Sequence, residues 1–164
     1  EISPITLALV FAGRVGSGIS AELAGMVQRQ QIDTLQAFGV NPIQKLVTPR
    51  IISAIIMLPA LTFLGDISAI IGGNLITTYQ YHTDSALYWS SIRSILDQKN
   101  TVFGVVKPFA FGYIIATVSC HIGLSSQGGS LGLKNAATKS YVLSTVLVMI
   151  TDFLITKVVW MFFP

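Results

Sequence analysis

Long apolar stretches constrain the fold of this chain more than any other feature of its sequence. A helix that crosses the hydrocarbon core of a bilayer, about 30 Å thick, needs about 20 predominantly apolar residues. Full candidates of this kind run over residues 51–77, 102–124 and 141–163, and a partial one runs over residues 4–26. Only 10% of the residues are charged, against about 25% in soluble domains. We therefore predict an all-α integral membrane protein, folded as a polytopic helical bundle.

The distribution of basic residues predicts how the spans are oriented. Polar segments at residues 27–50 and 78–101 and a predicted Gly/Ser-rich loop at residues 125–140 separate the apolar stretches, so alternating spans place the first segment and the loop on one side. The basic residues of those two segments are Arg29, Lys45, Arg50, Lys134 and Lys139, whereas the 78–101 segment has Arg93 and Lys99. Because an excess of Lys and Arg marks the cytoplasmic side, we expect residues 27–50 in the cytoplasm and the C-terminus outside.

The 78–101 segment contains a shorter helical pattern within SALYWSSIRSIL. Its apolar residues on one side of a helix are Leu87, Tyr88, Ile92, Ile95 and Leu96. Tyr88 and Trp89 suit a membrane interface, where one edge of the ring meets water and the other meets hydrocarbon. The apolar stretch is too short for a span, so we predict an interfacial or re-entrant helix.

The glycines of GRVGSG, residues 13–18, resemble a phosphate-binding loop only superficially. A Walker loop needs a Lys after its glycines and a strand before them, and neither is present. The glycines instead belong to rows of small residues spaced by four, which let membrane helices approach closely. One row is Ala8, Ala12, Gly16, Ser20 and Ala24, beside Gly13, Ser17, Ala21 and Gly25; a further row is Gly65, Ala69 and Gly73. We assign Ala12, Gly13, Gly16 and Ser20 to helix packing, either within the chain or at a dimer seam.

Ionisable residues inside the apolar stretches need a special environment. Asp66, Lys107, Asp152 and Lys157 all lie there, and a charge at the bilayer centre costs at least about 2.5–3.5 kcal/mol. Asp66 and Asp152 are therefore candidate intramembrane charges. Asp152 could make a structural hydrogen bond or an interhelix ion pair, or it could act directly on a substrate or a proton.

No arrangement of residues predicts catalysis or metal binding. His121 lies beside Cys120 without further ligands at metal spacing, and no Ser-His-Asp order or carboxylate pair is apparent. Basic and aromatic residues are not interleaved as they are in proteins that bind single-stranded nucleic acid. We expect a transport subunit rather than an enzyme, with no cofactor or metal on this chain and no nucleic-acid partner.

The polar segment QRQQIDTLQAFGVNPIQKLVTPR predicts a short amphipathic helix over residues 28–42. Ile32, Leu35 and Phe38 recur at helical spacing among polar residues. Gly39 is placed as a C-terminal cap, and Asn41-Pro42 makes a turn. The apolar face could enter a groove of a soluble partner, or it could rest on the lipid surface.

Three stretches of this sequence resemble the MlaE-type (YrbE-like) permeases of the MCE lipid-transport systems. They are EISPITLALVFAGRVGSGISAELAGM, QIDTLQAFGVNPIQKLVTPR and the later DFLIT. The resemblance covers essentially the whole chain and implies that residues 28–42 form a coupling helix that docks on an ATPase subunit. The residues implied in this contact are Asp33, Leu35, Ala37, Phe38, Gly39 and Pro42. ATP and Mg²⁺ would then be bound by the ATPase.

The resemblance also implies a lipid pocket at the start of the chain. Glu1-Ile2-Ser3-Pro4 matches the end of the family pattern R-E-L-G-P, with Ile for Leu and Ser for Gly. In the family this region lies by a lipid pocket between two permease copies, so the role passes to Glu1 and Ile2. Family members carry further N-terminal helices, and residues 1–164 are therefore expected to be the C-terminal part of an MlaE-type permease domain.

The resemblance further implies a set of partners and a location. The partners are a second permease copy, a cytoplasmic ABC ATPase, a periplasmic MCE-domain protein, a STAS-domain protein and phospholipid. The location is the inner membrane of a Gram-negative-type bacterium, where transport would contribute to outer-membrane lipid asymmetry. Two alternatives stay open: a secondary transporter driven by an ion gradient through Asp66, Asp152 and Lys157, and a membrane scaffold without transport.

Overall fold

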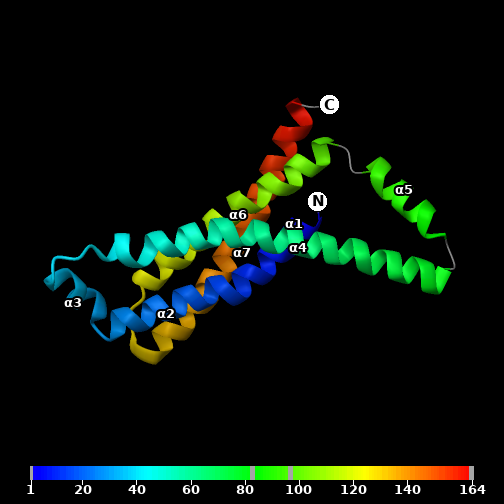
Figure 1. Cartoon of the computed structure of the whole chain (residues 1–164). Coiled ribbons are helices and arrows are strands. Elements are labelled where there is room, and N and C mark those ends of the chain that lie inside the picture. The colour runs from blue at the N-terminus through cyan, green and yellow to red at the C-terminus, as the bar shows by residue number, and fades with distance from the viewer. Residues whose placement is uncertain (1, 82–83, 96–97, 163–164) are drawn as a thin grey trace.

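The computed structural model describes residues 2–81, 84–95 and 98–162, and no strand occurs among them. The first span consists of α1 (Ile2–Phe11), a π-helical segment η1 (Ala12–Gly16) and α2 (Ser17–Gln28). A short helix α3 (Gln31–Ala37) and a second π-helical segment η2 (Ile43–Val47) lead into α4 (Thr48–Tyr81). The remaining helices are α5 (Ser85–Ile95), α6 (Gln98–Leu124) and α7 (Gly129–Phe162), and Figure 1 shows α3 and α5 at opposite ends of the bundle.

In the described part of the chain, four helices are long and apolar enough to cross a membrane. They cover Ile2–Gln28, Ile43–Gln80, Gly104–Leu124 and Leu131–Val158. Large apolar side chains remain exposed on their outer faces, such as Ile56, Phe63 and Leu64 on α4. Lipid, rather than water, is the solvent that suits such faces. The predicted fold class is confirmed.

The predicted loop at residues 125–140 is wrong, because α7 begins at Gly129. Gly128 and Gly129 adopt positive φ angles of 103° and 65°, which side chains with a Cβ rarely tolerate. These two glycines complete the turn, and the small residues after them are compatible with a helix. The segment at 78–101 does contain a separate short helix, α5, although Leu96 lies outside the described residues.

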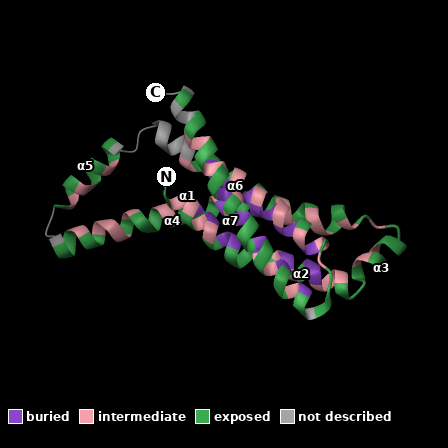
Figure 2. Cartoon of the chain, turned by 180° about the vertical axis from the view of Figure 1, so that it is seen from behind, coloured by how far each residue is buried: buried purple, intermediate pink, exposed green. Residues whose placement is uncertain are grey.

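Helix α6 lies at the centre of the bundle and packs against α1, α2, α4 and α7. Buried residues, purple in Figure 2, lie mainly where these helices meet. Two glycines of α6 let neighbouring backbones approach closely. A Cβ on Gly112 would lie 2.7 Å from the backbone oxygen of Ala54 on α4, and one on Gly123 would lie 2.9 Å from that of Ser20 on α2.

The small-residue row of the first span lies against α6 within the same chain. Ala8, Ala12, Ser20 and Ala24 are fully buried. A Cβ on Gly16 would lie 2.9 Å from the Ser119 hydroxyl oxygen, so this glycine has a packing partner in α6. Gly13 belongs to the neighbouring row and faces the ring of Tyr141 on α7, 3.3 Å from where its Cβ would be.

Two of the three glycines of α4, Gly65 and Gly73, also have partners within the chain, whereas a Cβ on Gly72 would meet nothing within 4 Å. A Cβ on Gly65 would lie 2.7 Å from a methyl group of Leu7 on α1. Gly73 leaves room for the ring of Tyr88 on α5, whose hydroxyl donates to the backbone oxygen of Ile70 at 2.9 Å. This contact holds α5 against the half of α4 that is farther from α3.

We expect Gly112→Ala to lower the free energy of unfolding by about 1–3 kcal/mol, as overpacked cores do. The added methyl group would push the α4 backbone away from α6 at Ala54. Gly104→Ala on the same helix is the matched control, because a Cβ there meets nothing within 4 Å. Unfolding in detergent measures both variants, and equal stability of the two would contradict this account of the α4–α6 contact.

Candidate functional site

The short helix α3 lies in the connection between α2 and α4 and has well-defined ends. Gln30 adopts a left-handed conformation (φ 55°) and begins the helix after the end of α2. At the other end Gly39 has a φ of 74°. The Gly39 N–H donates to the Gln36 carbonyl at 2.9 Å, and the Val40 N–H donates to the Leu35 carbonyl at 3.0 Å. These are the two hydrogen bonds of a Schellman cap, so the predicted cap at Gly39 is present.

Beyond the cap, the chain turns back toward the membrane. The Asn41 side-chain oxygen accepts a hydrogen bond from the Ile43 N–H at 3.0 Å, which stabilises the turn at Pro42 and starts η2. The helix itself, Gln31–Ala37, is shorter than the predicted 28–42 because Gln28 still belongs to α2.

The apolar residues of α3 are available to a partner. No residue of α3 is buried, and the Phe38 side chain that follows it is 80% exposed. Figure 1 shows α3 projecting beyond the ends of the long helices. The six residues assigned to ATPase coupling lie on this one projection: Asp33, Leu35, Ala37, Phe38, Gly39 and Pro42.

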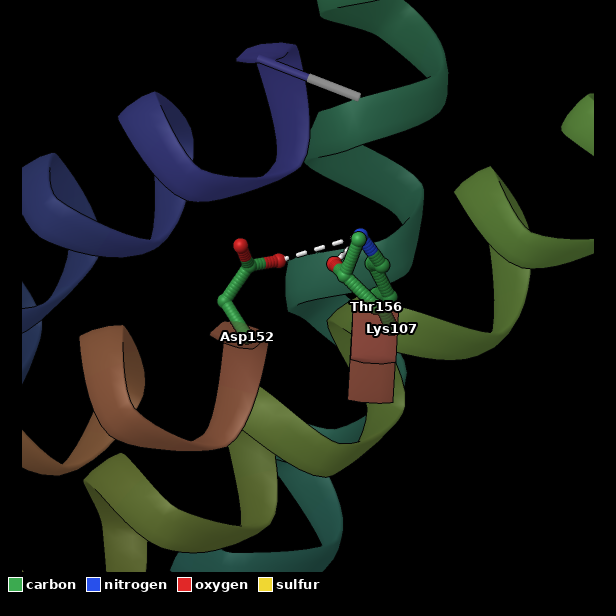
Figure 3. A network of polar contacts seen from close by, with 3 residues as sticks. All are labelled: Lys107, Asp152 and Thr156. Atoms are coloured by element: carbon green, nitrogen blue, oxygen red, sulfur yellow. Dashed lines mark hydrogen bonds and ion pairs between the residues drawn. The ribbon is translucent and has the colours of Figure 1, made fainter. Parts of the chain in front are cut away.

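A buried ion pair connects α6 and α7. The Lys107 side chain is 2% exposed, and its Nζ lies 3.1 Å from Oδ1 of Asp152. Nζ also donates a hydrogen bond to Oγ1 of Thr156 at 2.9 Å, and Figure 3 shows the three side chains converging. The contact with Asp152 is ionic rather than a directed hydrogen bond, since Oδ1 lacks a hydrogen-bond donor among the described residues.

This ion pair offsets the free-energy cost of placing the charges of Lys107 and Asp152 inside apolar helices. Removing either partner would leave the other charge buried and uncompensated, which destabilises proteins by about 3–5 kcal/mol. Lys107 lies about one turn into the span Gly104–Leu124 and Asp152 lies in the last third of Leu131–Val158, so both belong to the same end of the bundle. The geometry favours the ion-pair interpretation of Asp152.

The other predicted site residues do not join this pair. Asp66 is half-buried on α4 and makes no ion pair within the described part of the chain. Lys157 is exposed on α7. Ile2 is 80% exposed at the start of α1, and Glu1 lies outside the described residues.

Two arginines have no site role among the sequence-based predictions, although Arg50 was counted toward the orientation. Arg14 is exposed on η1, near the middle of the first span. Arg50, at the start of α4, forms an ion pair with Glu22 of α2, with 3.0 Å between Nη2 and Oε1. The signal that could have found Arg14 is the one applied to Asp152, a charge in an apolar stretch.

Comparison with known protein families gives a match over nearly the whole chain. The family model described as permease MlaE matches residues 1–158. The chain belongs to the MlaE permease family. In the described residues no group of three His, Cys, Asp or Glu side chains could hold a metal ion.

Relatives of this MlaE-family permease are found in bacteria and plastids. A "probable ABC transporter permease protein" of Rickettsia typhi is 38% identical over 160 residues, covering 98% of this chain and 62% of that protein. Another from Rickettsia conorii is 40% identical over 157 residues, covering 96% and 61%. The protein TRIGALACTOSYLDIACYLGLYCEROL 1, chloroplastic, of Arabidopsis thaliana is 33% identical over 157 residues, covering 96% and 45%. The chain thus spans about three-fifths of the rickettsial relatives, which are named as transport components.

We expect a double-mutant cycle to reveal the Lys107–Asp152 pair of this MlaE-family permease. Lys107→Met and Asp152→Leu should each lower the free energy of unfolding by about 3–5 kcal/mol. The double variant should recover most of that loss, because neither charge is then left alone. Lys157→Met, an exposed position on α7, is the control and should change stability by less than about 1 kcal/mol. Additive effects of the two single variants would show that the charges do not interact.

Proposed function

We propose that this chain is the permease subunit of an ABC transporter that moves phospholipids or related lipids. The observation that carries the proposal is α3, a capped helix that projects from the bundle with Phe38 80% exposed. An amphipathic helix of this kind suits the groove of a soluble protein. In an MlaE-family permease, the fitting partner is an ABC ATPase on the cytoplasmic side.

The connections of α3 support a coupling role. It is joined through a left-handed residue to α2, and through the Pro42 turn and η2 to α4. The Glu22–Arg50 ion pair ties α2 and α4 together next to that connection. A force applied to α3 by an ATPase would therefore act on two membrane helices at once. ATP and Mg²⁺ would be held by the ATPase, and this chain would supply no catalytic residue.

Two observations support a lipid as the substrate. The name of the Arabidopsis relative, TRIGALACTOSYLDIACYLGLYCEROL 1, refers to a glycerolipid. Ile2, at the start of α1, is 80% exposed in the single chain. A residue that lines an apolar pocket between two permease copies would be exposed in this way when only one copy is present. In this proposal Glu1 and Ile2 contribute to that pocket.

The proposed assembly contains two permease copies and several further partners. A periplasmic MCE-domain protein would exchange lipid with the pocket, and a STAS-domain protein would bind the ATPase. The assembly would lie in the inner membrane of a Gram-negative-type bacterium and support outer-membrane lipid asymmetry. The exposed Arg14, near the middle of the first span, needs an anionic or polar neighbour at membrane depth. A second permease copy or a lipid phosphate would provide one.

An ion-gradient-driven transporter is the second candidate function, favoured by one observation, the intramembrane carboxylate of Asp152. That carboxylate already lies 3.1 Å from Lys107, and Asp66 is on a different helix without an ion pair among described residues. Asp152 is thus already paired with a cation and is not an open site for a proton or Na⁺. We therefore prefer the ATP-driven mechanism, in which transport ignores an imposed pH or Na⁺ gradient.

We expect Phe38→Asp in the full-length protein to reduce copurification of the ATPase at least about tenfold, because a charge replaces an apolar anchor. The permease should still insert, since Phe38 makes no buried contact within the chain. Gln36→Asp is the matched control, with the same added charge at an exposed position of α3. Mass spectrometry of the complex purified in mild detergent, with ATP-dependent lipid transfer in proteoliposomes, measures the effect.

The outcome of this experiment decides between the candidate functions. An ATPase that still copurifies with the Phe38→Asp variant would remove α3 from the coupling role. Lipid or ion movement that follows a pH gradient without ATP would favour the secondary transporter. A complex without lipid and without transport would favour a scaffold.

A further inference from the structure

A polar cavity lies between the end of α6 and the start of α7, on the same end of the bundle as α3. Its volume is about 270 Å³, and Figure 1 shows the α6–α7 turn and α3 at that end. The proposed function has not used this cavity. The residues that matter for its chemistry are His121 and Ser125 of α6, Gln127 of the turn, and Gly132, Asn135 and Lys139 of α7.

Two contacts between α6 and α7 bound the cavity. Deep in the bundle, the Ser140 hydroxyl donates to the Ser119 hydroxyl at 2.9 Å. At the turn the two helices are also close, because a Cβ on Gly132 would overlap the backbone oxygen of Gln127. The α7 residues that line the cavity follow each other at intervals of three and four, so they share one face of that helix. The cavity is the space between the two contacts.

The cavity presents hydrogen-bond donors and a positive charge. Lys139 contributes an ammonium group, and the His121 imidazole and the Asn135 amide contribute N–H groups. None of its described lining residues is acidic, and neither Lys139 nor His121 forms an ion pair within the described part of the chain. The Ser125 hydroxyl is not a free donor, because it donates to the His121 carbonyl at 2.8 Å. A carboxylate suits such donors, since charge-assisted hydrogen bonds are the stronger ones.

The cavity extends from the edge of the hydrocarbon toward the aqueous side. A Cβ on Gly123 would lie 2.9 Å from the backbone oxygen of Ser20, so the last turn of α6 is level with that part of α2. Two residues farther along α2, Glu22 pairs with Arg50, where the apolar part of α4 begins. The start of α7 and the α6–α7 turn therefore lie beyond the hydrocarbon. With residues 27–50 in the cytoplasm, as the basic residues predict, the cavity faces the cytoplasm.

The end of α2 joins the cavity to α3. Nε2 of Gln28 donates to the Gly129 carbonyl, and the same atom lies 3.7 Å from where a Cβ on Gly132 would be. Gln28 is the last residue of α2, and α3 begins at Gln31. A soluble protein that contacts α3 therefore lies next to the cavity.

We propose that this cavity binds an Asp or Glu side chain of the ABC ATPase, as a second contact beside α3. The carboxylate accepts hydrogen bonds from the Lys139 ammonium group and the His121 imidazole. This inference rests on the proposed function, because it names a further contact of the same partner. The contact at Phe38 is apolar and the contact in the cavity is ionic, so only the second weakens as salt screens the charges.

The first test is a cross-linking experiment on the full-length permease in complex with its ATPase, purified in mild detergent. A carbodiimide takes up the water that is lost when a Lys amine and a carboxylate in contact form an amide bond. We expect such a bond between Lys139 and an Asp or Glu of the ATPase, located by mass spectrometry of the peptides. Lys134 is exposed on α7 but does not line the cavity, so it is the matched control and should form no such bond.

The second test measures the affinity of the ATPase for permease variants in detergent. Lys139→Glu should weaken binding at least about tenfold, because two like charges then meet in the cavity. Lys134→Glu makes the same charge reversal outside the cavity and should change binding by less than about threefold. Asn135→Trp fills the cavity without a change in charge and should also weaken binding. All three side chains are exposed, so the variants should still insert.

Four results would overturn the proposal. A Lys139 amide bond to another segment of the permease would show that the permease itself fills the cavity, and equal affinities of Lys139→Glu and Lys134→Glu would remove the ionic contact. ATPase affinity unchanged by Asn135→Trp would show that no side chain enters the cavity. Phosphatidylglycerol that copurifies with wild type and is lost in Lys139→Glu, at unchanged ATPase affinity, would assign the cavity to a lipid head group.

Failure of this inference is distinguishable from failure of the proposed function. ATPase binding that is lost in Phe38→Asp but unchanged in Lys139→Glu would overturn the second contact and leave the coupling role of α3 in place. A wild-type permease that binds no ATPase would contradict both.

Discussion

Close backbone contact around α6 is the interaction on which the rest of this bundle depends. Hydrocarbon surrounds the spans, so burial of apolar surface gives little drive for one helix to join another. The contacts that remain are van der Waals packing and polar pairs. At Gly112 and Gly123 the backbones of α4 and α2 come so near that no side chain fits between. The Ser140 hydroxyl, buried on α7, donates to the Ser119 hydroxyl of α6 at 2.9 Å, and Lys107 adds an ion pair farther along the same interface.

The sequence was sufficient for the features that depend on local rules. The spans follow from apolar length, and the cap of α3 follows from Gly39, because a helix end in the left-handed conformation favours glycine. The start of α7 was missed since glycine and serine are typical of loops, whereas the turn needs only the two glycines at 128 and 129. The residues after these glycines form a helix, which their composition does not predict.

Features that depend on tertiary contact were beyond the sequence. No residue close to Asp152 in the sequence indicates Lys107 as its partner, because the two side chains meet only when α6 packs on α7. Gly112 and Gly123 lie four residues from Ala116 and Ser119, but this spacing alone does not show which neighbouring backbone each glycine meets. Arg50 lies at the edge of a polar segment and was counted only toward orientation, although its neighbours in the fold are Glu22 and an apolar groove.

The length of α4 has a mechanical consequence. Its 34 residues extend over about 51 Å, well beyond the about 30 Å of hydrocarbon. One end continues into the connection that contains α3, and the other is in contact with α5 through Tyr88. A rigid rod of this length that tilts by about 5° about one end moves its other end by about 4 Å. Helix α4 continues through Pro59 without a break, so a tilt of the whole helix at its α3 end would displace α5 near the other end without any chain of rearranged side chains between them.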